Sequence, residues 1–246
     1  MNHNPELRDK IISLSKIYFE QGNTTEFIPG KTYIAPSGKV LDADDCAHLI
    51  DASLDMWLTA GRFARQFEAD LPVKFGRAHS KLTGSGSSAN LLAFSTLCSP
   101  KLGERRIIRG SEVITVAAGF PTTVNPIFQN GCIPVFVDID IETHNVDVDL
   151  LEAAITEKTA AIMIAHSLGN PFNVERTKEI CDKHNLYLIE DCCDAFGAKF
   201  KGQGVGTFGD ASTLSFYPAH HITMGEGGAV LFDRYAFAKI CESIRD

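Results

Sequence analysis

The spacing of hydrophobic and polar residues differs between the first part of this chain and the rest. Apolar residues recur at helical spacing over residues 5–21, which predicts an amphipathic helix. Residues 22–40 are rich in turn formers and predict extended chain. A capped helix is predicted over residues 42–61, followed by another over 62–74. We therefore expect residues 1–60 to form a helical and extended N-terminal segment.

From Lys81 onward, short apolar stretches alternate with amphipathic ones. The predicted strands cover residues 111–119, 133–140, 159–166, 186–191, 211–216 and 227–232. The predicted helices cover residues 85–98, 121–131, 147–156, 173–185 and 234–246. Apolar strands that alternate with helices are typical of an α/β domain, in which helices cover both faces of a mostly parallel sheet. We expect this domain to fill residues 61–246.

The length of 246 residues suits one large domain or slightly more. The last predicted helix is still unfinished at Asp246, with no capping residue and no tail after it. This favours a partial chain of a longer protein; the alternative is that the helix closes a small one.

Composition and charge narrow the class of protein. The chain has 44% hydrophobic and 22% charged residues, as a soluble globular protein does. Its formal net charge of -8 argues against nucleic acid or an anionic membrane as main partner, since both favour basic surfaces. No run of about 18 apolar residues predicts a membrane span. The N-terminus lacks a signal-peptide core and the seven cysteines are scattered, which predicts a cytoplasmic protein with reduced thiols.

A glycine- and serine-rich turn, "TGSGSSANLL" at residues 83–92, precedes the first helix of the α/β region. Free backbone N–H groups at such a helix start can bind an anion, and Ser87 and Ser88 add donors. The turn is no Walker loop, because no Gly-Lys-Ser/Thr follows it. A simple helix cap remains the alternative.

Two further residues follow strand ends, where ligands of open α/β sheets bind. Asp191 ends the strand "LYLIED", and its carboxylate could pair with a protonated ring nitrogen and keep a pyridine ring an electron sink. Phe120 follows another strand and could stack on a flat ring. The alternatives are a helix-capping Asp191 and ordinary core packing of Phe120.

The stretch "SFYPAHHITMGEGG", residues 215–228, carries the remaining candidates. Ser215 could donate to a phosphate, and the glycines near the end permit a tight turn into the last strand. His220 could act as a general base, because an imidazole with its ordinary pKa of about 6.5 titrates near neutrality. The alternative is that His220 and His221 are polar loop residues.

These features occur in one fixed order, and together they resemble the DegT/DnrJ/EryC/StrS sugar aminotransferases, which are fold type I pyridoxal-phosphate enzymes. The resemblance covers about residues 60–246. It implies the large domain of that fold, with a mostly parallel seven-stranded sheet, while the C-terminal small domain would be missing from this chain. The implied cofactor-binding residues are Gly86, Ser87, Ser88 and Ser215 at the phosphate, Phe120 on the ring and Asp191 at its nitrogen.

Where that family has the lysine that binds the cofactor covalently, this chain has His220, and no lysine lies between Lys201 and Lys239. Imidazole forms no stable imine with an aldehyde. The cofactor is therefore expected to bind noncovalently, as pyridoxamine 5'-phosphate (PMP), with His220 removing its C4′ proton so that dehydration replaces amino transfer. Many of the aminotransferases have Gln or His where this chain has Asp194, and His is common where Tyr217 stands. Both residues are further predicted cofactor-site residues.

Within the family, the same stretch closely resembles the CDP-4-keto-6-deoxyglucose 3-dehydrases, which serve 3,6-dideoxyhexose and lipopolysaccharide O-antigen biosynthesis. This resemblance implies a CDP-sugar substrate, a homodimer, a [2Fe-2S] cluster and an NADH-dependent iron–sulfur flavoprotein reductase as partner. Cys193 matches the first cluster ligand; the other three would belong to a C-x-C-(x)7-C group beyond Asp246. A buried thiol is the plainer interpretation of Cys193.

Two other functions stay open. The first is a GDP-4-keto-6-deoxymannose 3-dehydratase-like enzyme, which uses a histidine but no iron–sulfur cluster. The second is a noncatalytic relative that has lost the lysine and only binds sugar nucleotides. The presence of Asp191 and Ser215 argues against the second, because a dead site needs no partner for a ring nitrogen.

Overall fold

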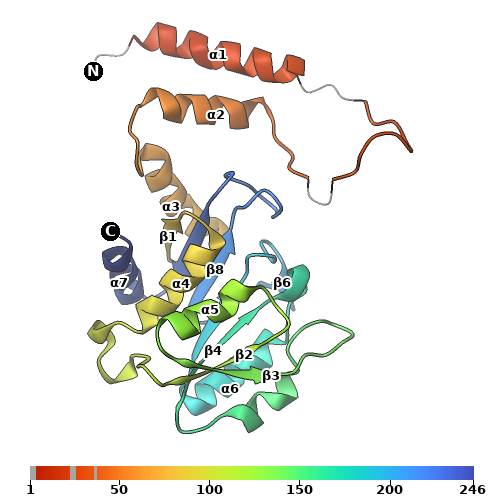
Figure 1. The fold of residues 1–246 in the computed structure, drawn as a ribbon. Helices are drawn as coiled ribbons and strands as arrows, with labels where there is room; N and C mark the ends of the chain where they lie inside the picture. Colours follow the sequence, from red (N-terminus) through yellow and green to blue (C-terminus); the bar gives the residue numbers. More distant parts are fainter. Residues whose placement is uncertain (1–3, 23–25, 36–37) are drawn as a thin grey trace. The chain divides into compact units, whose positions relative to one another are not determined.

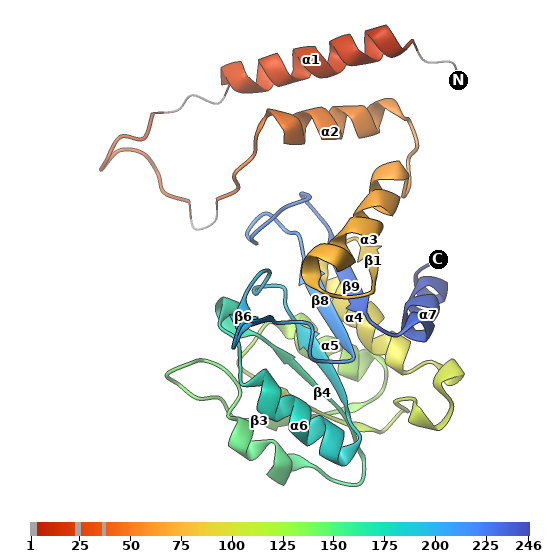
Figure 2. The same ribbon diagram turned by 180° about the vertical axis from the view of Figure 1, so that it is seen from behind.

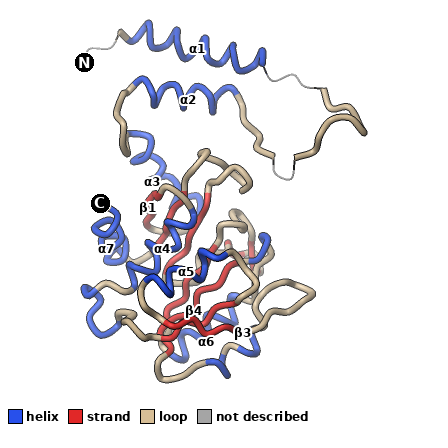
Figure 3. The backbone as a smooth tube through the Cα atoms, in the orientation of Figure 1, coloured by secondary structure: helices blue, strands red, loops and turns tan. Residues whose placement is uncertain are grey.

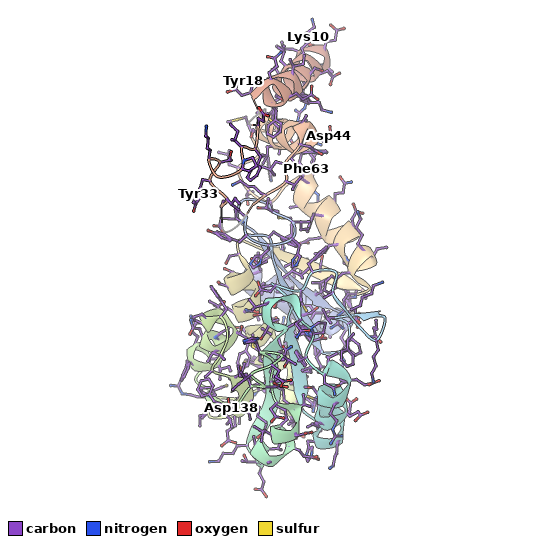
Figure 4. All side chains as sticks on the ribbon, turned by 90° about the vertical axis from the view of Figure 1, so that its right-hand side faces the viewer. Lys10, Tyr18, Tyr33, Asp44, Phe63 and Asp138 are labelled. Carbon is purple, nitrogen blue, oxygen red and sulfur yellow. The ribbon has the colours of Figure 1, made fainter. Side chains whose placement is uncertain are left out.

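The computed structural model describes residues 4–22, 26–35 and 38–246, and its contacts divide the chain into two units, residues 1–67 and 68–246. In the first unit, α1 (Pro5–Gly22) lies beside α2 (Ala43–Leu54). Figure 4 shows Lys10 and Tyr18 on α1 and Asp44 at the start of α2. The two helices are joined by ion pairs such as the one between Lys16 and Asp44.

The helix predicted over residues 42–61 is shorter than expected. Asp42 caps its start in a capping box with Asp45, as the sequence indicates. The helix ends at Leu54, however, because Met56 adopts a left-handed backbone conformation with φ of 48°. A new helix, α3, then covers Arg62–Phe75 and confirms the prediction for 62–74.

The second unit is built on a seven-stranded sheet with the strand order β1-β9-β8-β5-β4-β2-β3. Figure 3 shows strands in red between the blue helices. The strands are β1 (His79–Thr83), β2 (Glu112–Val116), β3 (Ile133–Val137), β4 (Thr159–Ala165), β5 (Tyr187–Asp191), β8 (Ala211–Ser215) and β9 (Gly228–Phe232). Strand β9 is antiparallel to both of its neighbours, and the other pairs are parallel. The prediction of a mostly parallel seven-stranded sheet is confirmed.

Helices cover both faces of the sheet, as predicted (Figures 1 and 2). One face carries α4 (Gly86–Leu97), α5 (Pro121–Gln129) and α7 (Tyr235–Arg245), and the other carries α6 (Val174–His184). The core alternates accordingly: in β5, Ile189 belongs to the cluster under α4, whereas Leu188 belongs to the cluster under α6.

In the second unit, the structure corrects the sequence-based elements at a strand and at a helix. Strand β1 was not predicted, because "HSKLT" is largely polar and lies at the sheet edge, where no apolar alternation is required. The helix predicted over 147–156 is wrong: the segment forms two short 3-10 turns, Val148–Leu150 and Glu152–Ala154. The Asp147 carboxylate accepts a hydrogen bond from the Asp149 amide and favours a tight local turn there.

Smaller elements fill the connections of the second unit. They are the hairpin β6 (Lys199–Phe200) and β7 (Gln203–Gly204), and the 3-10 segments Pro100–Arg105 and Ser167–Gly169. In the part of the chain that the structure describes, no helix combines the length and the apolar character needed to cross a bilayer.

Candidate active site

A cavity of about 880 Å³ opens at the carboxyl ends of the parallel strands, which is where such sheets bind ligands. The strand ends bring together segments far apart in the sequence. Nine of the ten predicted site residues line the cavity: Gly86, Ser87, Phe120, Asp191, Cys193, Asp194, Ser215, Tyr217 and His220. Ser88 does not line it; its amide and hydroxyl instead bond to the side chain of Ser85.

One end of the cavity is formed by the start of α4. Ser85 caps the helix by accepting the Ser88 amide, which leaves the first helical N–H groups directed outward. Gly86 allows a close approach here: a Cβ on Gly86 would lie 2.5 Å from the Ser215 Cβ and 2.9 Å from the Cys193 Sγ. Backbone donors and the Ser215 hydroxyl are therefore packed into one small area, as a phosphate site requires.

The carboxylate of Asp191 lies at the end of β5, in a site that is only 4% exposed. Its Oδ2 accepts hydrogen bonds from Asn90 Nδ2 at 2.8 Å and Thr123 Oγ1 at 2.7 Å. Its Oδ1 accepts the Cys193 amide at 3.1 Å. A buried carboxylate held by several donors can serve as the partner of a cationic ring nitrogen.

His220 lies on the loop between β8 and β9, and its Nδ1 is 3.2 Å from Asp194 Oδ1. The loop is held at its base because the Phe216 amide donates to the Gly227 carbonyl and the Met224 amide donates to the Phe216 carbonyl. The His220 amide donates to the Tyr217 carbonyl, and the two rings meet edge to face at 6.4 Å. A carboxylate that faces Nδ1 favours the tautomer with a free Nε2, which is the form that acts as a base.

The cavity mouth carries exposed apolar side chains. Phe120 is 67% exposed and directly precedes α5, which has Pro121 at its first position. Leu168 is 84% exposed, lines the cavity and adopts a left-handed φ of 53°, which is uncommon for a residue other than glycine. Flat or apolar ligand groups can be received at this mouth.

A second group of potential ligand atoms lies on the buried side of the site, formed by His166, Glu190 and Cys192. Glu190 accepts the amides of Gly206, Phe208 and Gly209 and lies 3.1 Å from His166 Nε2. Its carboxylate oxygens are thus occupied by protein donors. We interpret Glu190 as the anchor that holds the 206–209 loop on the sheet.

The site fits PMP by its residues. The crowded start of α4 offers backbone N–H groups and a hydroxyl to a phosphate, and the buried Asp191 offers an anion to a protonated pyridine. The size of the cavity suits a cofactor and part of a substrate.

The described residues do not fit a [2Fe-2S] cluster in the same way. Such a cluster takes four protein ligands, usually cysteines. Cys193 is the one cysteine lining the cavity and belongs to no group of three potential ligands among the described residues. Burial, the charge of Asp191 and a hydrogen bond with Asp191 all raise the pKa of the Cys193 thiol.

A sequence profile of the DegT/DnrJ/EryC1/StrS aminotransferase family matches residues 40–246. The chain belongs to this family. It is 58% identical to the lipopolysaccharide biosynthesis protein RfbH of Salmonella typhimurium over 98% of this chain and 55% of the relative. It is 51% identical to the dTDP-4-dehydro-2,6-dideoxy-D-glucose 3-dehydratase of Saccharopolyspora spinosa, over 98% of this chain and 52% of that protein. The chain thus spans about half the length of the curated relatives it matches.

The fold is shared with a solved structure, the GDP-4-keto-6-deoxy-D-mannose-3-dehydratase of Escherichia coli with bound hydrated PLP. That structure matches with a TM-score of 0.79 and 35% identity, over 85% of this chain and 53% of the other. The prediction of the fold type I large domain is therefore confirmed.

Sequence reasoning missed several residues of the site. Asn90 and Ser85 line the cavity, as do His144 and Glu226. Asn90 left a signal, because it is a polar residue on the buried side of α4, beside Ala89 and Ala93. The others occupy loops whose path the sequence pattern does not specify.

Proposed function

We propose that the protein is a PMP-dependent nucleotide-sugar C-3 dehydratase that acts on a 4-keto-6-deoxyhexose. The observation that carries the proposal is the pairing of His220 with Asp194 at the position of the family's lysine. The named functions of the relatives agree with it: two of them are 3-dehydratases of nucleotide sugars.

The cofactor, when bound, supplies an amine that condenses with the sugar ketone and a ring that accepts electrons. In the proposed site, the start of α4 and Ser215 hold the phosphate, and Asp191 keeps the ring nitrogen protonated. Phe120 covers the ring face. Noncovalent binding agrees with the E. coli relative, in which PLP is bound in hydrated form.

With the cofactor bound, His220 would accept the proton from its C4′ at Nε2. Asp194 faces the other ring nitrogen at 3.2 Å and stabilises the imidazolium that forms. The hydroxyl on C3 of the sugar would leave, and the proton lost from C4′ balances the hydroxide as one water, so this step is a dehydration without net oxidation or reduction. Because His220 is only 21% exposed, the abstracted proton is partly shielded from bulk water.

We further propose a CDP-linked 4-keto-6-deoxyglucose as substrate, on the likeness of the 215–228 loop to the enzymes that use it. Full-length protein with PMP should be incubated with the CDP-, dTDP- and GDP-linked 4-keto-6-deoxyhexoses. Mass spectrometry then measures the loss of water from each sugar. Turnover of the CDP sugar alone supports the assignment. Preference for the GDP sugar would favour the alternative dehydratase, and no turnover of any sugar would contradict the proposed function.

The reduction that completes the 3-deoxy sugar consumes two electrons, and we propose that NADH supplies them through an iron–sulfur flavoprotein reductase. The same proposal includes a [2Fe-2S] cluster with Cys193 as one ligand. It also includes a homodimer and a cytoplasmic location for O-antigen synthesis. In this proposal, Cys193 is the one cluster ligand among the described residues. Assays of iron and sulfide in wild-type and Cys193→Ser full-length protein test this: wild type without iron would overturn the cluster, and full iron in the variant would remove Cys193 from it.

A further inference from the structure

Asn90 is a buried amide inside the apolar helix α4, and it bonds to the carboxylate that faces the cavity. Asn90 is 1% exposed, and its Nδ2 donates to Asp191 Oδ2 at 2.8 Å. Its Oδ1 accepts the hydroxyl of Thr213 at 2.6 Å. A carboxylate only accepts hydrogen bonds, so the amide group can have one orientation here.

The donors around Asp191 are distributed unevenly over its two oxygens. Oδ2 receives both the Asn90 amide and the Thr123 hydroxyl, which occupies its two lone pairs. Oδ1 receives the Cys193 amide at 3.1 Å. The Thr213 hydroxyl is 3.5 Å from Oδ1 but has a single proton, which goes to the closer Asn90. Oδ1 therefore keeps one position for a further donor.

Among the described residues, the thiol of Cys193 is the remaining donor near this carboxylate. A thiol donates weakly, whereas a protonated pyridine nitrogen is a charged donor, so the ring takes the open position on Oδ1 when it binds. The residues that fill Oδ2 thus decide which oxygen serves the cofactor.

The fold itself does not require an amide at position 90. The neighbours of Asn90 on the buried side of α4 are Ala89, Leu92 and Ala93, all apolar. Asparagine is a poorer helix former than leucine, and a buried amide must find a partner for each polar atom. The amide of Asn90 finds its partners in Asp191 and Thr213, so its role is to bind the Asp191 carboxylate.

We propose that Asn90 is a positioning residue that, with Thr123, fixes Asp191 so that Oδ1 is presented to the ring nitrogen of the cofactor. By donating to Oδ2, Asn90 also withdraws charge from the carboxylate and so sets how strongly it holds the ring proton. This inference rests on the proposed function in one respect, namely that Asp191 binds the ring nitrogen.

The test compares full-length Asn90→Leu with wild type, both loaded with PMP labelled with ¹⁵N in the ring. The matched control is Thr96→Val. This variant removes another buried polar group of α4, the hydroxyl that donates to the Leu92 carbonyl. Asn90→Leu is expected to weaken PMP binding by roughly tenfold, as for loss of a hydrogen bond to a charged group. It should also shift the ¹⁵N resonance of the ring, which a merely structural role would not do.

Unchanged affinity and an unchanged resonance in Asn90→Leu would overturn the proposal, as would equal shifts in Thr96→Val. If Asn90→Leu does not fold, Thr123→Val removes the other donor to Oδ2 and must shift the resonance instead. Asp191→Asn separates the two proposals. The proposed function fails if wild type binds no PMP, or if Asp191→Asn leaves the ¹⁵N resonance of the ring unchanged. Only the inference on Asn90 fails if Asp191→Asn shifts this resonance while Asn90→Leu and Thr123→Val do not.

Discussion

Nδ1 of His220 lies 3.2 Å from Oδ1 of Asp194, so the proposed base is paired with a carboxylate three residues past Asp191. The sequence placed Asp194 among the cofactor-binding residues. In the structure Asp194 contacts the proposed base, and it lines the same cavity. We therefore assign Asp194 the role of orienting His220.

Replacing Asp194 by Asn should slow dehydration by about 10- to 100-fold, because the imidazole loses its charged partner and a fixed tautomer. The affinity for PMP should change little, since Asp194 acts on His220. Single-turnover rates and PMP titrations of the same variant distinguish the two effects. A loss of PMP affinity in proportion to the rate would return Asp194 to the cofactor-binding group.

Replacing His220 by Lys should restore covalent attachment. With PLP added, borohydride reduction of His220→Lys should leave the cofactor bound to residue 220, whereas wild type should retain none. The matched control is His221→Lys, in which an amine is added to an exposed neighbour. Equal labelling of the two variants, measured by peptide mass spectrometry, would show that position 220 does not face the cofactor aldehyde.

Gly86→Ala tests the phosphate end of the cavity. The added Cβ would lie 2.5 Å from the Ser215 Cβ, a distance that forces β8 and α4 apart. PMP binding should fall at least about tenfold, with a loss of stability of about 1–3 kcal/mol from overpacking. Gly84→Ala is the control, since a Cβ added to Gly84 would meet no atom within 4 Å. If Gly84→Ala lowers PMP affinity as much, the effect belongs to the turn as a whole.

Glu190→Gln tests the buried anchor. Burial opposes the charge of Glu190, but the bond and charge of His166 and the Gly209 and Gly206 amides lower its pKa below the usual value of 4.5. The ionised carboxylate of Glu190 therefore stabilises the fold at pH values above 4.5, the pKa of the unfolded chain. This stabilisation is lost as the pH falls through the lower pKa of the folded state. Gln would present an NH₂ group to backbone N–H donors. We therefore expect the free energy of unfolding, measured with urea at pH 7, to fall by about 3 kcal/mol.

The same experiment has an internal control. Glu175 forms a surface ion pair with Lys201, and Glu175→Gln should change stability by less than about 1 kcal/mol. As pH falls below about 4.5, wild type should lose stability faster than Glu190→Gln. Parallel pH profiles would contradict a charged Glu190 in the folded protein.

The sequence predicted the parts of the fold that depend on periodic burial. Strands such as β5, whose five residues are all buried, and helices such as α6 were found because their apolar pattern is distinct. The edge strand β1 and the 3-10 turns of residues 148–154 were not, since pairing at an edge and local side-chain turns leave no periodic signal.

The candidate site was predicted to a similar extent and for a similar reason. Residues at strand ends and helix starts, such as Asp191 and Gly86, have positions fixed by the topology of the sheet. Contacts between side chains, such as Asn90 with Asp191 or His220 with Asp194, depend on packing across segments about 26 to 101 residues apart. The sequence names those residues but does not pair them.

The central claim is that His220 moves the proton at C4′ of a noncovalently held cofactor. The most direct measurement is exchange of the C4′ hydrogen of PMP with deuterated solvent in the presence of the 4-keto sugar, comparing wild type with His220→Asn at matched PMP occupancy. We predict rapid exchange in wild type and none above background in His220→Asn. Exchange at the wild-type rate in His220→Asn would contradict the account.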